Sequence, residues 1–342
     1  MAKAGSLVVG LGVASASLAV LARRRRRQLL DLSDRTALVT GGSRGLGFLI
    51  ARELIRQGCR RVAICARDLD QLAFAQELLS AEGVQVVALP CDVSDQRQVE
   101  NLIQQVEERL GAVDLLVNNA GVIQVGPQAA LTEADYREAL DIMFWGVLRP
   151  TLAVLPGMRR RRAGHIVNIT SIGGKISVPH LSAYSSAKFA AAGFSEGLHA
   201  ELAREGIAVT TVVPGLMRTG SHLNAKFKVD ADYPLFALGA SLPGISMDAE
   251  RAARQIVAAA RRGATEVILS LPAKVAVRVN GVAPASVSRV LGLVARLLPA
   301  APAQPTQASS GREVERRKPN AGLRLATALS RNAARRFNEV RP

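Results

Sequence analysis

The sequence predicts an α/β protein: a single doubly wound domain with a seven-stranded parallel sheet, an N-terminal apolar helix and a flexible C-terminal tail. The main observation is that short β-branched runs alternate with longer helical stretches between about residue 35 and residue 270. Repeated strand–helix units form a parallel sheet that helices cover on both faces. The 342 residues also contain no internal repeat, so one domain is expected.

Seven strands are expected, connected by six right-handed crossovers. They are Thr36–Thr40, Arg61–Cys65, Val84–Leu89, Leu115–Asn118, His165–Thr170, Val209–Val213 and Glu266–Leu269. The corresponding α/β catalytic domain spans residues 31–272.

Residues 1–30 combine an apolar run with a cluster of arginines. No charged residue occurs from Gly5 to Ala22, and Arg23 to Arg27 follow at once. Eighteen helical residues would span about 27 Å, close to the roughly 30 Å of a hydrocarbon core, and the arginines favour the cytoplasmic side. This predicts a membrane anchor with the catalytic domain facing the cytoplasm. A cleaved signal peptide and a looser interfacial helix are the alternatives.

The chain changes character after residue 272. Residues 273–299 are expected to contain an amphipathic helix that covers the substrate cleft, joins a dimer or lies on the membrane. Its apolar face would consist of Val287, Val290, Leu291, Val294 and Leu298. Residues 300–342 are expected to be a basic, largely disordered tail. Within it, residues 321–338 are expected to form a short basic helix, either solvated or on a membrane surface.

Charge and cysteine content exclude two classes of protein. The net charge of +16 is mostly terminal, because residues 1–30 and 300–342 contribute +6 each and the remainder +4. A nucleic-acid-binding domain would instead have a basic face interleaved with aromatic residues, so no nucleic-acid partner is expected. Cys59, Cys65 and Cys91 lack the spacing of metal ligands, and they are interpreted as buried free thiols, with no metal site.

A glycine-rich turn, Thr40-Gly41-Gly42-Ser43-Arg44-Gly45-Leu46-Gly47, directly follows the first expected strand. Glycines here let the backbone turn sharply and approach a pyrophosphate, while the N-terminus of the next helix faces the phosphate charge. The turn therefore predicts a dinucleotide site. Its expected cofactor-binding residues are Gly41, Ser43, Arg44, Gly45, Leu46 and Gly47.

The end of the second strand indicates which dinucleotide binds. In proteins that bind NAD, an Asp or Glu at this strand end binds the ribose 2′-hydroxyl. Here Ala66 and Arg67 follow Cys65 instead. Arg44 lies in the turn near the same ribose. Because guanidinium groups match phosphate geometry, Arg44 and Arg67 favour the 2′-phosphate of NADP (NADPH).

Tyr184 and Lys188 stand four residues apart in an expected helix, so their side chains share one face. A nearby ammonium group should lower the pKa of the phenol, which then exchanges a proton with the substrate oxygen during hydride transfer. The hydroxyl of Ser171 is suited to holding that oxygen. Ser171, Tyr184 and Lys188 are the predicted catalytic residues.

Over about residues 33–270 the chain resembles the short-chain dehydrogenases/reductases. Further motifs of this resemblance are Asp92-Val93, Asn118-Asn119-Ala120-Gly121, and Pro214-Gly215 followed by Thr219. The resemblance implies a Rossmann-type fold and a homodimer or homotetramer formed through helices beside the active site. It also implies roles in binding the cofactor. Asp92 and Val93 would hold the adenine ring, Asn118 and Ala120 would support the sheet and line the adenine ribose, Pro214, Gly215 and Thr219 would flank the nicotinamide, and Lys188 would bind its ribose.

One position departs from the family pattern. Met143, in Asp141-Ile142-Met143-Phe144-Trp145-Gly146, stands where the family usually has an asparagine that holds a proton-relay water. A thioether is at best a weak acceptor, so the asparagine's role does not transfer to Met143.

Residues 216–245 form the expected substrate lid. It is apolar through Leu216, Met217, Leu223, Phe227, Tyr233, Leu235, Phe236 and Leu242, although these residues would also suit an ordinary core. The sequence thus predicts an NADP-dependent oxidoreductase that interconverts a small hydrophobic alcohol and its ketone or aldehyde. The alternative is a membrane-associated nucleotide-binding or scaffold protein with impaired catalysis.

Overall fold

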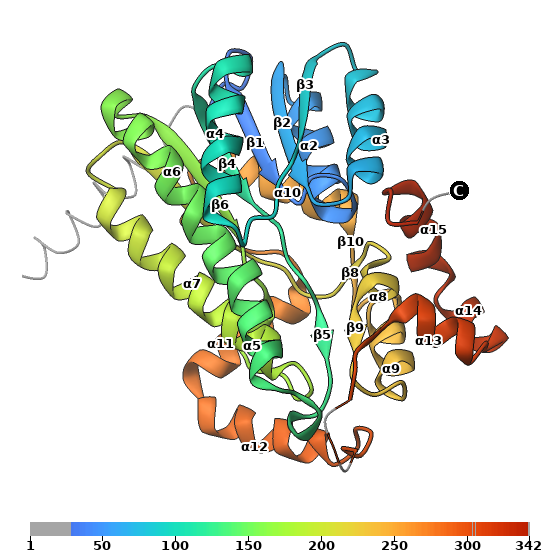
Figure 1. Ribbon diagram of the computed structural model, residues 1–342. Helices are drawn as coiled ribbons and strands as arrows, with labels where there is room; N and C mark the ends of the chain where they lie inside the picture. The colour runs from blue at the N-terminus through green and yellow to red at the C-terminus, as the bar shows by residue number, and fades with distance from the viewer. Residues whose placement is uncertain (1–28, 303, 305, 341–342) are drawn as a thin grey trace, which may run out of the picture. The chain divides into compact units, whose positions relative to one another are not determined.

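The computed structural model describes residues 29–302, 304 and 306–340 and contains the expected parallel sheet (Figure 1). Its strands are β1 (Thr36–Thr40), β2 (Arg61–Ala66), β3 (Gln85–Pro90), β4 (Val113–Asn118), β6 (Gly164–Ile169), β7 (Ile207–Val213) and β11 (Glu266–Ile268). They form one seven-stranded sheet in the order β11-β7-β6-β4-β1-β2-β3, and all pairs are parallel. The predicted α/β class and seven-stranded sheet are confirmed.

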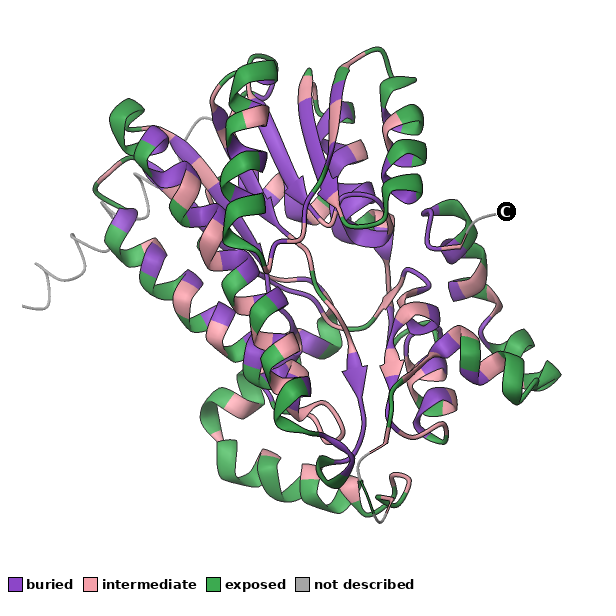
Figure 2. Cartoon of the chain, in the orientation of Figure 1, coloured by how far each residue is buried: buried purple, intermediate pink, exposed green. Residues whose placement is uncertain are grey.

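Helices cover the sheet in two layers (Figure 1). One layer contains α2 (Gly45–Arg56), α3 (Leu69–Ser80) and α10 (Ala249–Arg261), and the other contains α4 (Gln96–Leu110), α6 (Gly146–Arg161) and α7 (Ser182–Leu202). All residues of β1 are buried, and Figure 2 shows the same for most of the central sheet. This two-sided cover explains why the central strands are continuous apolar runs.

The strand order reverses between β1 and β4. The chain proceeds from β1 toward β2 and β3 on one side, and from β4 toward β6 and β7 on the other. In doubly wound sheets this reversal opens a crevice at the carboxyl ends of the strands, where ligands bind. The crevice here lies beside Thr40 and Asn118, the last residues of β1 and β4.

A long helix crosses one face of the domain. It comprises α5 (Glu133–Leu140), the π-helical turn η2 (Asp141–Trp145) and α6. Within the described part of the chain, this 29-residue helix alone is long and apolar enough to cross a membrane, but half of its apolar window is buried. Its burial favours a core helix and does not establish membrane anchoring. The anchor expected in residues 5–22 lies outside the described residues.

Residues 273–299 differ from the single amphipathic helix that was expected. They contribute to two helices, α11 (Leu271–Val282) and α12 (Pro284–Ala295), which are separated at Ala283. Pro284 cannot donate a backbone hydrogen bond to a preceding turn, so it starts the second helix. No residue of α12 is buried, as Figure 2 shows.

The expectation of a largely disordered tail is wrong for the described residues beyond 308. This segment forms β12 (Ser309–Ser310), α13 (Gly311–Arg317), α14 (Ala321–Ala326) and α15 (Ala328–Arg336). Strand β12 pairs antiparallel with β9 (Lys226–Phe227) of the lid, and Val314 packs in a buried cluster with Phe227 and Tyr233.

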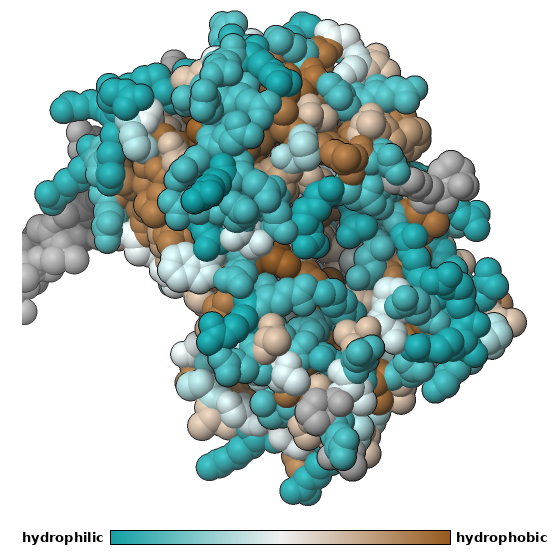
Figure 3. All heavy atoms as spheres, in the orientation of Figure 1, coloured by the Kyte–Doolittle hydropathy of each residue, from teal (hydrophilic) through white to brown (hydrophobic). Residues whose placement is uncertain are grey.

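The positive charge of this segment does not prevent folding, because the lid and α10 supply acidic partners. Arg317 lies 2.8 Å from Asp230, and Arg336 lies 3.0 Å from Glu250. The outer surface of α13–α15 is mainly hydrophilic (Figure 3). Composition alone therefore indicated a solvated tail, although Val314 is buried against the lid.

Candidate active site

The glycine turn is held against the end of β4 by reciprocal hydrogen bonds. Thr40 Oγ1 accepts from the backbone nitrogens of Asn119 (3.0 Å) and Ala120 (3.1 Å). Asn119 Nδ2 in turn donates to the carbonyl oxygens of Thr40 (3.0 Å) and Gly41 (3.1 Å). These bonds fix the backbone on both sides of the strand-order reversal.

The turn has no space for side chains at its key glycines. Gly41 has φ +62°, and a Cβ atom there would lie 2.9 Å from Ala120 Cα. A Cβ atom at Gly47 would collide with the carbonyl oxygen of Gly41. The start of α2 is therefore packed closely on the turn, which is the arrangement that a dinucleotide phosphate requires.

The two arginines expected at the adenine ribose both line the cavity at the turn. Arg67 Nη1 lies 3.6 Å from Asp92 Oδ2, and Arg44 Nη1 donates to Gln71 Oε1 at 3.3 Å. The Arg67 side chain is 63% exposed, so its ion pair with Asp92 constrains it weakly. The Arg67 guanidinium group is therefore accessible to an anion, whereas Arg44 already lies 3.7 Å from the Glu339 carboxylate.

Asn118 belongs to a buried polar network in the sheet. Its Nδ2 donates to Thr151 Oγ1 (3.0 Å) and Asn168 Oδ1 (2.9 Å), and Asn168 Nδ2 donates to Ser195 Oγ (2.9 Å). Asn118 does not line the cavity. Its place in the fold matches the supporting function implied for this motif, whereas the neighbouring Asn119 and Ala120 do line the cavity.

Tyr184 and Lys188 project from α7 toward the end of β6 and the residues that follow it. Lys188 is buried, and its Nζ donates to the carbonyl oxygen of Ile169 at 2.8 Å. Ser171 follows β6, and its Oγ accepts from the backbone nitrogen of Gly173 at 3.0 Å. A Cβ atom at Gly173 would lie 2.9 Å from Tyr184 Cε1, so this glycine permits the close approach of the ring.

Burial changes the acidity of both groups on α7. It raises the pKa of the Tyr184 phenol, and interaction with the Ser171 side chain offsets only part of this effect. Burial also lowers the pKa of the Lys188 ammonium group to about 8. The expected lowering of the phenol pKa by Lys188 is therefore not seen; desolvation dominates, because Lys188 is buried and Tyr184 is half-buried.

Met143 lies in the π-helical turn η2 and is fully buried. Its Cγ and Sδ atoms lie 3.7 Å from the position that a Cβ atom of Gly121 would occupy. Met143 also lines the cavity. Single π-helical turns are often found at functional sites, and this one places a thioether next to the strand-end turn.

A cavity of about 1120 Å³ extends from the glycine turn to Tyr184. Apart from Asn118, the predicted site residues all line it: Gly41, Ser43, Arg44, Gly45, Leu46, Gly47, Arg67, Asp92, Val93, Ala120, Ser171, Tyr184, Lys188, Pro214, Gly215 and Thr219.

The lid is partly core and partly cavity wall. Leu216, Met217, Leu235 and Phe236 line the cavity, whereas Phe227 and Tyr233 lie in a buried cluster behind it. Both interpretations of its apolar residues therefore apply, each to a different subset.

Sequence reasoning missed several polar residues that line the cavity, including His180, Asp232 and Glu339. His180 and Asp232 form a pair with 2.8 Å between Nδ1 and Oδ1, and Glu339 approaches from the C-terminal segment. The sequence does not indicate that His180 and Asp232 form a pair, because 52 residues separate them. Glu339 lay in a segment that was expected to be disordered.

Comparison with known proteins adds independent findings. A family model described as short chain dehydrogenase matches residues 35–228. A protein described as a ketoacyl reductase of Streptomyces coelicolor is 42% identical over 185 residues, which cover 54% of this chain and 70% of that protein. A glycine betaine reductase of Emericella nidulans is 40% identical over 196 residues, which cover 56% of this chain but 15% of that protein's length.

A solved structure of a ketoreductase also resembles this chain. A variant of actinorhodin polyketide ketoreductase with NADPH aligns with a TM-score of 0.61 and 34% identity, over 69% of this chain and 95% of that chain. The matched family segment contains the glycine turn, Ser171, Tyr184 and Lys188.

Proposed function

The chain belongs to the short-chain dehydrogenase family and is an oxidoreductase that acts on CH–OH or keto groups, and from this premise we propose that it interconverts a hydrophobic alcohol and its ketone or aldehyde with NADP(H). The observation that supports this proposal most directly is that Ser171, Tyr184 and Lys188 line the same cavity as the glycine turn. An enzymatic function is favoured over a non-catalytic scaffold, because the relatives are described as reductases.

Bound nicotinamide would supply or accept the hydride at the substrate carbon. Tyr184 gives its phenolic proton to the carbonyl oxygen during reduction, and a raised pKa suits this role because it keeps the phenol protonated. The Ser171 hydroxyl donates a hydrogen bond to the same oxygen. Lys188, protonated at neutral pH, stabilises the phenolate that remains.

The choice of NADP rests on charge at the adenine end. Arg44 and Arg67 both line the cavity there, and Ala66 stands at the end of β2, where a carboxylate would bind a ribose 2′-hydroxyl. Asp68, which follows Arg67, caps α3 by accepting from the backbone nitrogen of Gln71. The polyketide ketoreductase that aligns with this chain is described with NADPH, which supports the same assignment.

The substrate class rests on the lid. Leu216, Met217, Leu235 and Phe236 form an apolar wall of the cavity. An apolar wall favours substrates that bury hydrocarbon, and the relatives described as ketoacyl reductases point to ketones.

A membrane location is a further part of the proposal. The apolar run from Gly5 to Ala22, followed by five arginines, supports an anchor with the catalytic domain in the cytoplasm. The full-length protein should stay in the membrane fraction during carbonate extraction; release into the wash would contradict the anchor.

Self-association through α6 and α7 is also proposed. These helices expose Leu152 (53%) and Phe189 (43%), which a partner copy would cover. Light scattering of the purified protein should give the mass of a dimer or tetramer, and a monomeric mass would contradict this expectation.

A series of linear methyl ketones and aldehydes of increasing chain length tests the substrate proposal. With NADPH, kcat/KM should rise roughly fourfold per added methylene until the apolar wall is covered. The same series with NADH controls for cofactor choice. Turnover that is independent of chain length, or confined to charged substrates, would contradict a hydrophobic substrate.

A further inference from the structure

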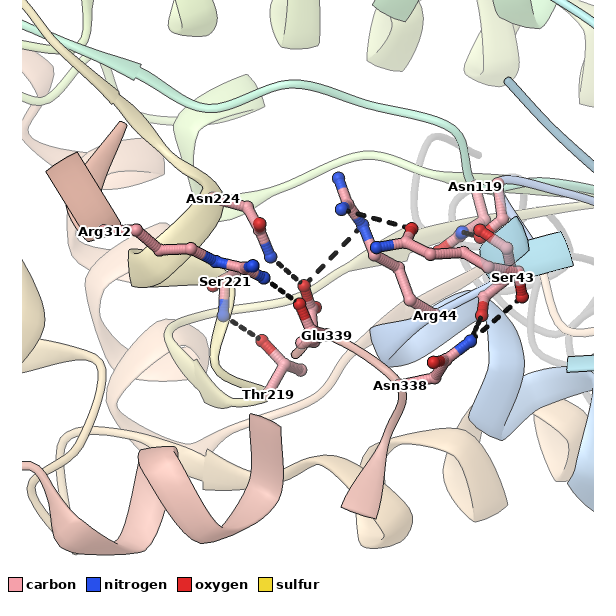
Figure 4. Close-up of polar contacts among 11 residues, drawn as sticks. Ser43, Arg44, Asn119, Thr219, Ser221, Asn224, Arg312, Asn338 and Glu339 are labelled. Atoms are coloured by element: carbon pink, nitrogen blue, oxygen red, sulfur yellow. Dashed lines mark hydrogen bonds and ion pairs between the residues drawn. The ribbon is translucent and has the colours of Figure 1, made fainter. Parts of the chain in front are cut away.

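The last residues of the described chain are attached to the glycine turn (Figure 4). The backbone nitrogen of Gly45 donates to the carbonyl oxygen of Phe337 at 2.8 Å. Asn338 Nδ2 donates to the carbonyl oxygens of Ser43 (2.8 Å) and Gln71 (3.0 Å). Residues 337–340, called the C-terminal segment below, thus use polar groups of the turn itself.

The carboxylate of Glu339 lies directly on this turn. A Cβ atom added at Gly45 would collide with Glu339 Oε1, so the side chain occupies the space that a glycine leaves open. Arg44 Nε lies 3.7 Å from Glu339 Oε2, and Asn224 Nδ2 donates to the same oxygen. Arg312 donates to the backbone carbonyl oxygen of Glu339 (Figure 4).

This position is the one that a dinucleotide phosphate needs. The start of α2 attracts an anion, because a helix N-terminus has a positive partial charge and N–H groups without partners inside the helix. The N–H of Gly45, which a phosphate could also use, is held by the Phe337 carbonyl oxygen in this structure. A carboxylate is such an anion. Glu339 is 5% exposed and lines the cavity that contains the predicted cofactor-binding residues. Two anions cannot occupy this place together.

The environment of Glu339 favours exchange with another anion. Burial raises the pKa of its carboxyl group, and the Arg44 charge, the Asn224 hydrogen bond and the Arg312 charge offset this only in part. A buried carboxylate with incomplete compensation is held less firmly than its contacts suggest. A phosphate would meet the same donors and would bring more negative charge to Arg44.

We propose that Glu339 competes with the cofactor for the phosphate site at the glycine turn, and that Asn224 is an additional phosphate-binding residue that Glu339 occupies until the cofactor replaces it. The proposal rests on the proposed binding of NADP(H) at this turn. The C-terminal segment must then leave the turn before the dinucleotide binds. The apparent affinity for cofactor is lowered by the fraction of molecules in which the segment is bound.

Titration of the full-length protein with NADPH, followed by nucleotide fluorescence, tests the competition. Glu339→Ala should lower the dissociation constant roughly tenfold, the size of effect expected for one partly buried charge at a helix terminus. Glu313→Gln is the matched control, because Glu313 lies in α13 and does not line the cavity, and a glutamine preserves its capping box with Ser310. The control should bind NADPH as the wild type does.

Asn224→Ala in the Glu339→Ala background tests the second half of the proposal. Removing this donor should weaken NADPH binding about tenfold relative to Glu339→Ala alone. Unchanged binding would remove Asn224 from the phosphate site. Binding by Glu339→Ala that is equal to or weaker than that of the wild type would overturn the competition.

Hydrogen exchange on the wild-type protein gives a readout that depends on no substitution. Because linkage is reciprocal, NADPH should speed amide exchange in residues 333–340. Slower exchange there would show that the segment closes over the cofactor, and would overturn the proposal. If neither wild type nor Glu339→Ala binds NADPH, the proposed cofactor is wrong and the competition fails with it.

Discussion

The ammonium nitrogen of Lys188 lies 6.0 Å from the centre of the Tyr184 ring. It donates to the carbonyl oxygen of Ile169 at 2.8 Å, so it is fixed beside the phenol by the end of β6. Both residues project from the same face of α7 into the cavity. In the proposed mechanism, this relationship makes the protonation of Lys188 a determinant of reduction.

The pH dependence of carbonyl reduction should therefore have a break near pH 8. The pKa of Lys188 is lowered to about 8, so the neutral amine predominates above that pH instead of above the ordinary value for lysine. A neutral amine does not stabilise the Tyr184 phenolate, and kcat/KM, which reports groups of the free enzyme, should fall as pH rises through 8. Lys188→Arg, whose charge persists, should lose this break. A wild-type profile that is flat between about pH 6 and 9 would contradict the role of Lys188.

Arg67→Asp should shift cofactor preference toward NAD. The substitution removes a cation from the adenine end of the cavity and places a carboxylate where it can bind a ribose 2′-hydroxyl. The ratio of kcat/KM for NADPH over NADH should fall roughly ten- to hundredfold, the value of one or two charged hydrogen bonds. Arg60→Asp is the control, because Arg60 is exposed just before the opposite end of β2. An unchanged ratio in Arg67→Asp would refute the NADP assignment.

Met143→Asn tests whether the missing asparagine limits proton supply. The new side chain would stand in the π-helical turn beside Gly121 and offer an acceptor for water. Single-turnover hydride transfer should become several-fold faster, while burial of the amide lowers stability by about 1–3 kcal/mol. Met143→Leu preserves volume and should alter neither quantity much. If the rate does not change in Met143→Asn, proton supply does not depend on this position.

Asn118→Leu should destabilise the fold without a specific loss of cofactor affinity. It leaves the hydrogen-bonding groups of Thr151 and Asn168 without their buried partner, at a cost of about 1–3 kcal/mol in the free energy of unfolding. Chemical denaturation measures this change. Asn101→Leu, at an exposed site on α4, should stay within about 0.5 kcal/mol of the wild type. Equal stability of the two variants would contradict the structural role of Asn118.

The sheet and most of the site were predictable because their signals are local. Each strand is a short apolar run, and the glycine turn occupies eight consecutive residues after the first strand. Tyr184 and Lys188 are four residues apart, so one helix suffices to align them. Local patterns of this kind are visible before any tertiary contact is known.

The order of the C-terminal residues was not predictable from local pattern. It depends on two contacts between segments that are far apart in the sequence. Val314 packs behind the lid, and Asn338 binds the backbone of Ser43, which lies 295 residues earlier in the chain. The raised pKa of Tyr184 was not predictable for a related reason. The sequence shows the nearby lysine but not the burial that outweighs it.

Removal of the Tyr184 hydroxyl tests the central claim most directly. In Tyr184→Phe, ketone reduction with NADPH should fall at least about a hundredfold, because the proton donor is lost, while the dissociation constant for NADPH stays near the wild-type value. Tyr136→Phe is the matched control, because Tyr136 bonds Ser182 at the start of the same helix but does not line the cavity. It should retain turnover. Undiminished reduction by Tyr184→Phe would contradict the assignment of Tyr184 as the acid, and with it the proposed mechanism.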